Sequence, residues 1–156
     1  MSVQLTEHRF LKIHYELKET WKQTTDYLLC SPDFHGHPRR DCVVLATDDP
    51  AKPVFGRLLL LFTYTVDNVK YPLALVEPFD GQGQHGQWWL KRDIDVGFYH
   101  LYSNPHIPSE IFSIYSIIRG ALIVPDFTKE GEYLIVDVVD ADMFLRIKEL
   151  FSRVEM

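Results

Sequence analysis

The sequence lacks the long apolar run, about 18 residues, that a membrane-spanning helix requires. Its longest apolar run, Leu58–Phe62, has only the length of a strand. The first ten residues carry charges and no apolar stretch, so they do not resemble a signal peptide. Only two cysteines occur in 156 residues, too few for a disulfide framework. An intracellular location is therefore expected, with the nucleus as one option.

The sequence also lacks an excess of positive charge. It has 16 basic and 22 acidic residues, a formal net charge of −6. This disfavours a dedicated nucleic-acid-binding domain, because contacts to phosphates supply most of the non-specific affinity of such domains. Two basic pairs, Arg39–Arg40 and Lys91–Arg92, are the candidates for a local nucleic-acid contact, with ordinary solvated surface pairs as the alternative.

Short stretches of apolar and β-branched residues, several of them alternating with polar ones, make up much of the chain and predict strands. The predicted strands cover residues 9–17, 41–46, 54–66, 70–79, 93–102, 111–125 and 133–139. Asp67 and Asn68 form a turn that joins two of these strands into a hairpin. Pro72 indicates an edge or a bulge in the hairpin, and Gly120 a bulge or bend in the segment 111–125.

Two helices are predicted from a 3.6-residue apolar period. The first covers residues 18–29, where Trp21, Thr25, Leu28 and Leu29 share one side. The second begins after Asp140, which is placed to cap it, with Asp142 in the first turn. Its apolar face is formed by Met143, Phe144, Ile147, Leu150 and Phe151.

The order of these elements predicts one mainly β (α+β) domain over residues 1–156. Strands do not alternate with helices, and the connections are short, so a small antiparallel barrel or strongly curled sheet is expected. The short N-terminal helix and the C-terminal helix would pack at its ends. By analogy of strand pattern, the closest architectures are the BAH and SH3-like barrels.

The segment between Cys30 and Cys42 holds four potential zinc ligands, Cys30, His35, His37 and Cys42. Zinc normally takes its ligands from two pairs spaced by two to four residues, whereas a single residue separates the two histidines. A cysteine nucleophile with a histidine base is a further alternative, but no oxyanion-hole pattern accompanies it. The preferred interpretation is a turn, because the segment is rich in the turn formers Pro, Asp and Gly and because Cys42 opens an apolar strand.

Two further groups of residues are candidates for function. Asp137, Asp140 and Asp142 could hold Mg²⁺ in a nuclease or hydrolase, or could be a solvated strand residue followed by a helix start. Four aromatic residues could form a cage for a methylated cation or a peptide, or could be packed inside the fold. These are Trp88, Trp89, Tyr99 and Tyr102, of which the two tryptophans follow a loop rich in Gly and Gln.

Three patterns occur in order along the chain: "FHGHPRRDC", "SIIRGA" and "VDVVDADMFLR". Together with the hairpin "LLLLFTYTVDNVKYPLALVEPF", they resemble an accessory domain of proteins encoded by or derived from Plavaka-type transposons of basidiomycete fungi. The resemblance covers about residues 13–148 and implies a region separate from the transposase catalytic core. The pattern keeps His35 and Cys42 but not reliably His37 or Cys30, which weighs against zinc.

The function expected from these observations is a non-enzymatic interaction module. It would bind a protein or peptide, on chromatin or in a transposase complex, without a cofactor and without a membrane. A metal-dependent nuclease or hydrolase and a nucleic-acid-binding accessory domain are the alternatives.

Overall fold

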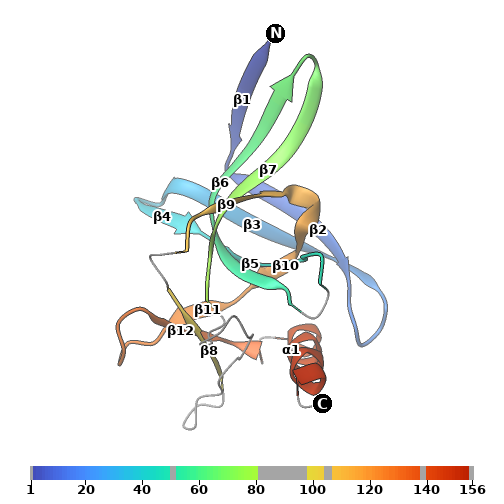
Figure 1. Ribbon diagram of the computed structural model, residues 1–156, viewed down its shortest axis with the longest axis vertical. Helices are drawn as coiled ribbons and strands as arrows, with labels where there is room; N and C mark the ends of the chain where they lie inside the picture. Colours follow the sequence, from blue (N-terminus) through green and yellow to red (C-terminus); the bar gives the residue numbers. More distant parts are fainter. Residues whose placement is uncertain (1, 50–51, 81–97, 104–106, 138–139, 155–156) are drawn as a thin grey trace.

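The computed structural model describes residues 2–49, 52–80, 98–103, 107–137 and 140–154, and its description of residues 149–154 covers the backbone only. Most of this chain is β-structure (Figure 1). The strands are β1 Val3–His8, β2 Phe10–Glu16, β3 Gln23–Phe34, β4 His37–Arg40, β5 Cys42–Leu45, β6 Val54–Val66, β7 Val69–Pro78, β8 Tyr99–Tyr102, β9 Glu110–Ser113, β10 Ile117–Ala121, β11 Ile123–Pro125 and β12 Glu132–Ile135. A 3-10 helix, η1 (Ile114–Ser116), precedes β10, and the α-helix α1 (Ala141–Val154) follows the last strand.

The strands form three antiparallel sheets. The largest has the order β10-β5-β6-β7-β9, and β1 pairs with the far half of β6. The other two sheets have the orders β2-β3-β4 and β11-β12-β8. The mainly β class with a C-terminal helix is therefore confirmed. The barrel is not confirmed, because none of the sheets closes on itself among the described residues.

The largest sheet is the middle layer, because it packs a core on each of its faces. Val43 and Leu45 of β5 belong to a first core, which they share with β2 and β3. Cys42 and Val44 point the opposite way, as the period of two in a strand requires, into a second core with β8, β12 and α1. All four residues of β5 are buried. This short central strand therefore holds the two cores together.

The hairpin of β6 and β7 follows the prediction closely. Asp67 and Asn68 adopt φ values of 50° and 65°, the left-handed pair of a type I′ turn, which matches the twist of the two strands. Pro72 pairs with Thr63 in a part of β7 that has no second neighbour among the described strands, because β9 pairs only with residues 73–76. The edge position predicted for Pro72 is therefore confirmed.

Gly120 does not mark a bulge. It lies in the regular pairing with Val43, and the irregularity falls between Ile117 and Arg119. A Cβ atom at Gly120 would lie 2.8 Å from Asp26 Oδ2 and from Leu28 Cδ2, so glycine is needed there for the close approach of β3 to β10.

The helix predicted for residues 18–29 is wrong. Residues 23–34 form β3, which pairs with β2 from Glu16↔Gln23 to Phe10↔Leu29. The apolar residues of this segment fit a helical period, but the seven-residue ladder with β2 buries Leu28 and Cys30 on one face, as a period of two also would. The tertiary pairing with β2 decided between the two periods.

The C-terminal helix is confirmed. Asp140 Oδ1 accepts a hydrogen bond of 2.7 Å from the backbone N–H of Met143, the expected cap. Met143 and Ile147 are buried in the second core, whereas Phe144 is 41% exposed. Leu150 and Phe151 lie where side chains are outside the description.

Three further points complete the fold. The strand predicted for 93–102 is described only for β8, since residues 93–97 lie outside the described residues. Asp137, expected on the solvent side, is 3% exposed, so that expectation is wrong. Of the helices that the structure describes, none has both the length and the apolar composition to cross a membrane.

Candidate functional site

The four potential zinc ligands are spread over the molecule. Cys30 is in the first core and Cys42 in the second, on opposite faces of the middle sheet. His35 and His37 lie exposed on the β3–β4 hairpin. Among the described residues these four do not form a group with metal-ligand distances. Their geometry therefore gives the zinc interpretation no support.

The turn interpretation of the same segment is confirmed. His35 and Gly36 have φ values of 52° and 87° at the tip of the hairpin. Asp33 Oδ1 accepts a hydrogen bond of 2.9 Å from the backbone N–H of Gly36, which closes the turn. Arg39 forms an ion pair of 3.3 Å with Asp41, and its guanidinium lies 5.0 Å above the Phe34 ring.

The proposed aromatic cage falls largely outside the described residues, because Trp88 and Trp89 belong to the segment 81–97. Tyr99 is buried in the second core. Tyr102 lies three residues further along β8, on its other face, and is partly exposed beside His100. The two tyrosines therefore do not face each other, and the four-residue cage stays a prediction. Lys91 and Arg92 of the second basic pair also lie outside the description.

The carboxylates considered for Mg²⁺ are held by arginine. Arg119, on β10, is 5% exposed and donates to Asp140 through both terminal nitrogens, at 2.9 and 2.7 Å. It also donates to Asp142 at 2.9 Å, and its guanidinium stacks 5.0 Å above the Tyr15 ring. The hydrogen bonds from Arg119 are the main reason why the pKa of Asp140 is lowered.

Asp142 is enclosed more completely still. Its Oδ2 accepts from Arg146 at 2.7 Å and its Oδ1 from the backbone N–H of Lys18 at 2.7 Å. Burial by itself would raise the pKa of Asp142, but these hydrogen bonds and the one from Arg119 outweigh it and lower the pKa. Asp137 does not join the other two in a metal-ligand group of the described chain. The arrangement ties β2, β10 and α1 together and does not present a metal site.

This arginine–aspartate cluster was not predicted from the sequence. The signal for it was an arginine inside the apolar strand "SIIRGALIV" and two acidic residues at the start of a helix. Arg119 comes from one of the patterns on which the resemblance depends, and Asp140, Asp142 and Arg146 come from another. These patterns therefore meet in a structural cluster.

Within the described residues, one group has spacing suitable for a metal ion: His100, Asp126 and Glu132. His100 is on β8, Glu132 is the first residue of β12, and Asp126 follows the end of β11. Asp126 Oδ1 already accepts two hydrogen bonds from Thr128, at 2.6 and 3.0 Å, which chiefly lower its pKa. Glu132 Oε2 lies 3.7 Å from Lys129 Nζ and 3.8 Å from His100 Nδ1. Asp126 is thus satisfied by Thr128, whereas the buried Oε2 of Glu132 has only these two long ion-pair contacts and accepts no hydrogen bond in the described structure.

A different surface stands out at the far end of the middle sheet. There β1 and the tips of β6 and β7 form a three-stranded arm that projects away from the rest of the molecule (Figure 1). Cross-strand partners share a face, so the arm has one apolar and one polar face. The apolar face consists of Val3, Leu5, Phe62, Tyr64, Val66, Val69, Tyr71 and Leu73, with Glu7 at its base. The polar face consists of Gln4, Thr6, His8, Thr63, Thr65 and Lys70, together with Pro72 and, at its base, Leu61 and Ala74 of the first core.

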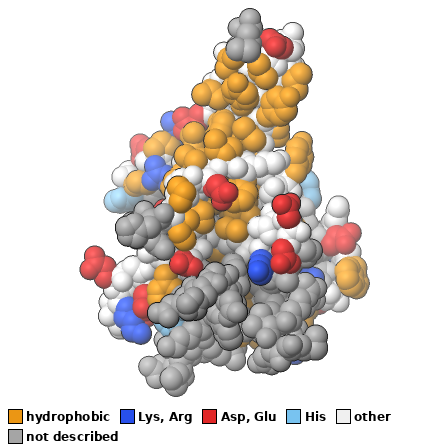
Figure 2. Space-filling model, in the orientation of Figure 1, with side chains coloured by type: hydrophobic (Ala, Val, Ile, Leu, Met, Phe, Trp, Pro, Cys, Tyr) orange, Lys and Arg blue, Asp and Glu red, His pale blue; other side chains and the backbone are white. Residues whose placement is uncertain are grey.

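No residue of the arm's apolar face belongs to either core. Leu5 is 66% exposed, and Val3, Val69 and Tyr71 are each about half exposed. Figure 2 shows the apolar side chains gathered over this projecting part of the molecule. Every residue of β1 is exposed, and β1 pairs with β6 alone in the described structure, so its outer edge is open. The sequence carried a signal for the apolar face, because Val3 and Leu5 alternate with Gln4 and Thr6.

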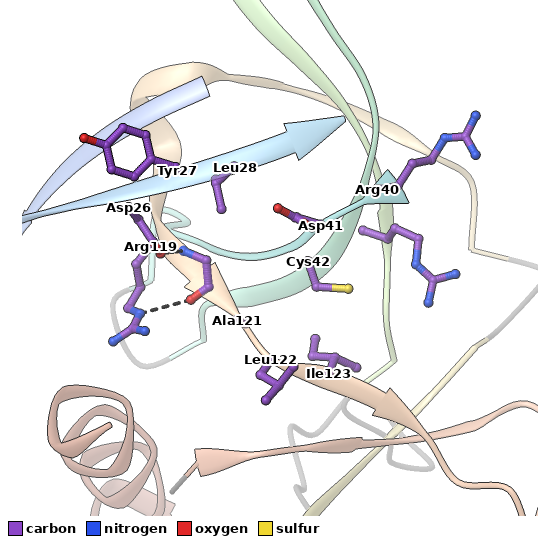
Figure 3. Close-up of a pocket in the computed structure, with 12 residues that line it drawn as sticks. Asp26, Tyr27, Leu28, Arg40, Asp41, Cys42, Arg119, Ala121, Leu122 and Ile123 are labelled. Carbon is purple, nitrogen blue, oxygen red and sulfur yellow. Dashed lines mark hydrogen bonds between the residues drawn. The ribbon is translucent and has the colours of Figure 1, made fainter. Parts of the chain in front are cut away.

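A pocket of about 410 Å³ lies between β3, β5, β10 and the start of β11. Figure 3 shows Arg119 on one side of it, Arg40 on the other, and Leu122 and Ile123 below Cys42. Arg57, from β6, also lines the pocket. Its position inside an apolar strand was the sequence signal for it, and it was not predicted as a site.

Comparison of the chain with protein-family models, with curated proteins and with solved structures gives no match. The function must therefore be argued from the geometry of the chain itself.

Proposed function

We propose that this protein is a non-enzymatic interaction module that binds an extended peptide segment of a partner along β1. The observation that carries the proposal is the arm, a sheet with one apolar face that no core covers and one open edge. Sheets in soluble proteins bury their apolar face against another element. Half of this face, at the tip of the arm, is exposed, and the other half is only partly buried. Such a face favours a partner from outside the described chain.

The open edge favours an extended strand as the partner's structure. Alternate residues of an edge strand direct their N–H and C=O groups outwards, and an added strand can pair with them. Natural edge strands are commonly blunted by proline, lysine or a bulge. β1 has none of these over Val3–His8, and its pairing with β6 is regular throughout. Strand addition is an established way in which domains bind peptides.

The two faces of the arm define the chemistry of the peptide. Side chains that continue the apolar face should be apolar, and those between them should be polar, because the period of a strand is two. Glu7 is the charged residue of the apolar face, and it forms no ion pair within the described chain. A lysine or arginine opposite Glu7 would add an attraction of about 0.2–1 kcal/mol.

Partners on chromatin or in a transposase complex, and a nuclear location, are the finer form of this proposal. They follow from the resemblance to Plavaka-type proteins, whereas the idea of a BAH- or SH3-like reader follows from the analogy of strand pattern alone. The arm supports the peptide-binding role without deciding which of these partners is involved.

The test is binding of synthetic peptides of about six to eight residues, the length of β1, to the full chain. Peptides with alternating apolar and polar residues should bind, and scrambled peptides of the same composition should not. Methylating the backbone nitrogens along one edge of the peptide should abolish binding, while methylating the other edge should have little effect. Isothermal titration measures the affinity, and hydrogen exchange should show slower exchange of β1 amides.

Leu5→Lys is the variant that tests the site, since it places a charge in the middle of the apolar face. Tyr115→Lys is the matched control, because Tyr115 is 86% exposed in η1, outside the arm. Loss of binding in the first variant and retention in the second supports the proposal. Equal binding by scrambled peptides, or equal loss in both variants, would contradict it.

A further inference from the structure

The pocket beside β5 is lined by more basic than acidic residues, and not all of these charges form ion pairs with one another. Its lining includes two acidic residues, Asp26 and Asp41, and three arginines. Asp26 Oδ2 accepts the N–H of Gly120 at 2.9 Å. Asp41 accepts from the N–H of Leu29 at 2.8 Å and pairs with Arg39, which lies outside the pocket. The charge of Asp41 is therefore balanced from outside the pocket, whereas Asp26 has a hydrogen bond but no ion pair within the described chain.

Of the three arginines, Arg119 is neutralised by Asp140 and Asp142. The other two, Arg40 and Arg57, form no ion pair with a carboxylate of the described chain. Glu77 lies opposite Arg57 in the β6–β7 ladder, yet the two are not within ion-pair distance. These two cations thus have no ion-pair partner in the described chain, and the carboxylate of Asp26 in the same lining offsets only one of them, so the pocket keeps an excess of positive charge.

Arg57 is also fixed in place. Its guanidinium lies 5.5 Å from the centre of the Phe79 ring and 5.4 Å from that of Tyr133. Cys42, its partner across β5 and β6, interacts with it through the thiol. Burial raises the pKa of Cys42 above its usual value, so the thiol is uncharged at neutral pH and does not balance the arginine. A half-buried guanidinium held beside two aromatic rings is suited to a planar or tetrahedral oxyanion.

We propose that this pocket binds a small organic anion whose carboxylate or phosphate group is held by Arg57 and Arg40. The apolar side chains of Leu122 and Ile123 would contact the organic part. The volume of about 410 Å³ lies within the range of small-molecule sites. This site is on the body of the molecule and is independent of peptide binding by the arm.

Isothermal titration of the full chain with three probes tests the proposal: inorganic phosphate, phenyl phosphate and benzoate. Phenyl phosphate should bind more tightly than inorganic phosphate, because its ring can contact the apolar wall. Benzoate against phenyl phosphate distinguishes a preference for carboxylate from one for phosphate. Binding of either organic anion supports the site.

Three variants locate the binding. Arg57→Lys keeps the charge but loses the planar fork, and it should weaken binding by about tenfold to a hundredfold, the worth of a charge-assisted hydrogen bond. Arg40→Gln should weaken binding by a smaller factor because Arg40 is exposed. Arg39→Gln is the matched control, since this neighbouring arginine is paired with Asp41 and does not line the pocket. Circular dichroism and a nitrogen–proton spectrum verify that each variant is folded.

Two results would overturn the proposal. One is the absence of binding by all three probes at millimolar concentration. The other is an equal effect of Arg39→Gln and Arg57→Lys, which would indicate a general attraction of anions to surface cations. Because peptide binding by β1 is measured with different ligands and with Leu5→Lys, failure here leaves the proposed function standing, and the reverse also holds.

Discussion

The arm and the body of this protein are built from the same kind of strand but treat their apolar faces differently. In the body, β5 sends Val43 and Leu45 into one core and Cys42 and Val44 into another. In the arm, Val3 and Leu5 of β1 alternate with the polar Gln4 and Thr6, and both apolar side chains are about half exposed or more. Alternation of apolar and polar residues in a strand therefore predicts an apolar face. It does not predict whether other parts of the chain bury that face.

The two regions also differ in how they hold charge. The body buries Arg119 and Asp142, which pair with each other, with Asp140 and with Arg146. The arm carries Glu7 with no such partner within the described chain. A buried ion pair is costly to break because the remaining charge is left unsolvated. We therefore expect the body to be intolerant of changes that the arm accepts.

The largest effect is expected from Arg119→Met. This change leaves the buried carboxylate of Asp142 without one of its two arginines and removes both hydrogen bonds to Asp140. The free energy of unfolding should fall by about 3–5 kcal/mol. Denaturation by urea measures it. Arg119→Lys keeps the charge without the fork and should lie between the wild type and Arg119→Met.

Arg39→Met is the control for this prediction. The Arg39–Asp41 pair is also within ion-pair distance, at 3.3 Å, but the side chain of Arg39 is 47% exposed. Exposed pairs contribute about 0–1 kcal/mol, so this change should be nearly silent. If the two arginine variants had equal stability, the buried cluster would not be what holds β2, β10 and α1 together.

Gly56→Ala should have the next largest effect. A Cβ atom at Gly56 would overlap Val76 Cγ1 and lie 3.1 Å from the carbonyl oxygen of Glu77. Val76 is fully buried, so the extra methyl has no room, and we expect a loss of about 1–3 kcal/mol. Val76→Ala should make space for the methyl, so the double variant should lose less than the sum of the two single losses. Additive losses in urea denaturation would show that the crowding is not at Val76.

A smaller and gradual effect is expected from acid. The pKa values of Asp140 and Asp142 are lowered in the folded protein, so the unfolded chain binds protons more readily. Their contribution to stability is complete above the unfolded pKa, about 4, and is lost as the pH falls towards the folded values. Each carboxylate can contribute a slope of at most about 1.4 kcal/mol per pH unit.

Thermal unfolding between pH 6 and pH 2.5 measures this slope. Asp140→Asn removes one of the two titrating groups and should show a shallower dependence on pH than the wild type. An unchanged slope in the variant would mean that other carboxylates cause the loss of stability in acid.

Much of the fold could be predicted from local pattern. The hairpin of β6 and β7 was predicted to within a residue at each end, because the Asp67–Asn68 turn and the two apolar runs determine it locally. The segment 23–34 could not be assigned correctly, since its residues fit both periods and only the ladder with β2 decides. Burial of Asp137 likewise depends on what packs over it.

The candidate sites were harder to predict than the fold. Neither the arginine–aspartate cluster nor the pocket is local in sequence: Arg119 and Asp142 are 23 residues apart, and Arg57 and Tyr133 come from different sheets. The signal in the sequence was a single charged residue inside an apolar strand. Such a residue indicates that it has an interaction partner in the folded chain, but the sequence does not show which residue that is. The open edge of β1 depends on the absence of a neighbouring strand, which no local pattern can report.

The smallest effect on the free energy of unfolding is expected at Leu5 of the arm, where substitution should have a large effect on peptide binding. Leu5→Ala should change the free energy of unfolding by less than about 0.5 kcal/mol, because Leu5 is 66% exposed and its methyl groups lose little by the change. Leu58→Ala, the same substitution at a fully buried position of β6, should cost about 2–5 kcal/mol. Equal losses in the two variants would mean that the arm's apolar face is covered in solution, either by the chain itself or by a second copy. Sedimentation of the wild type separates these two cases, since only a second copy would make the mass depend on concentration.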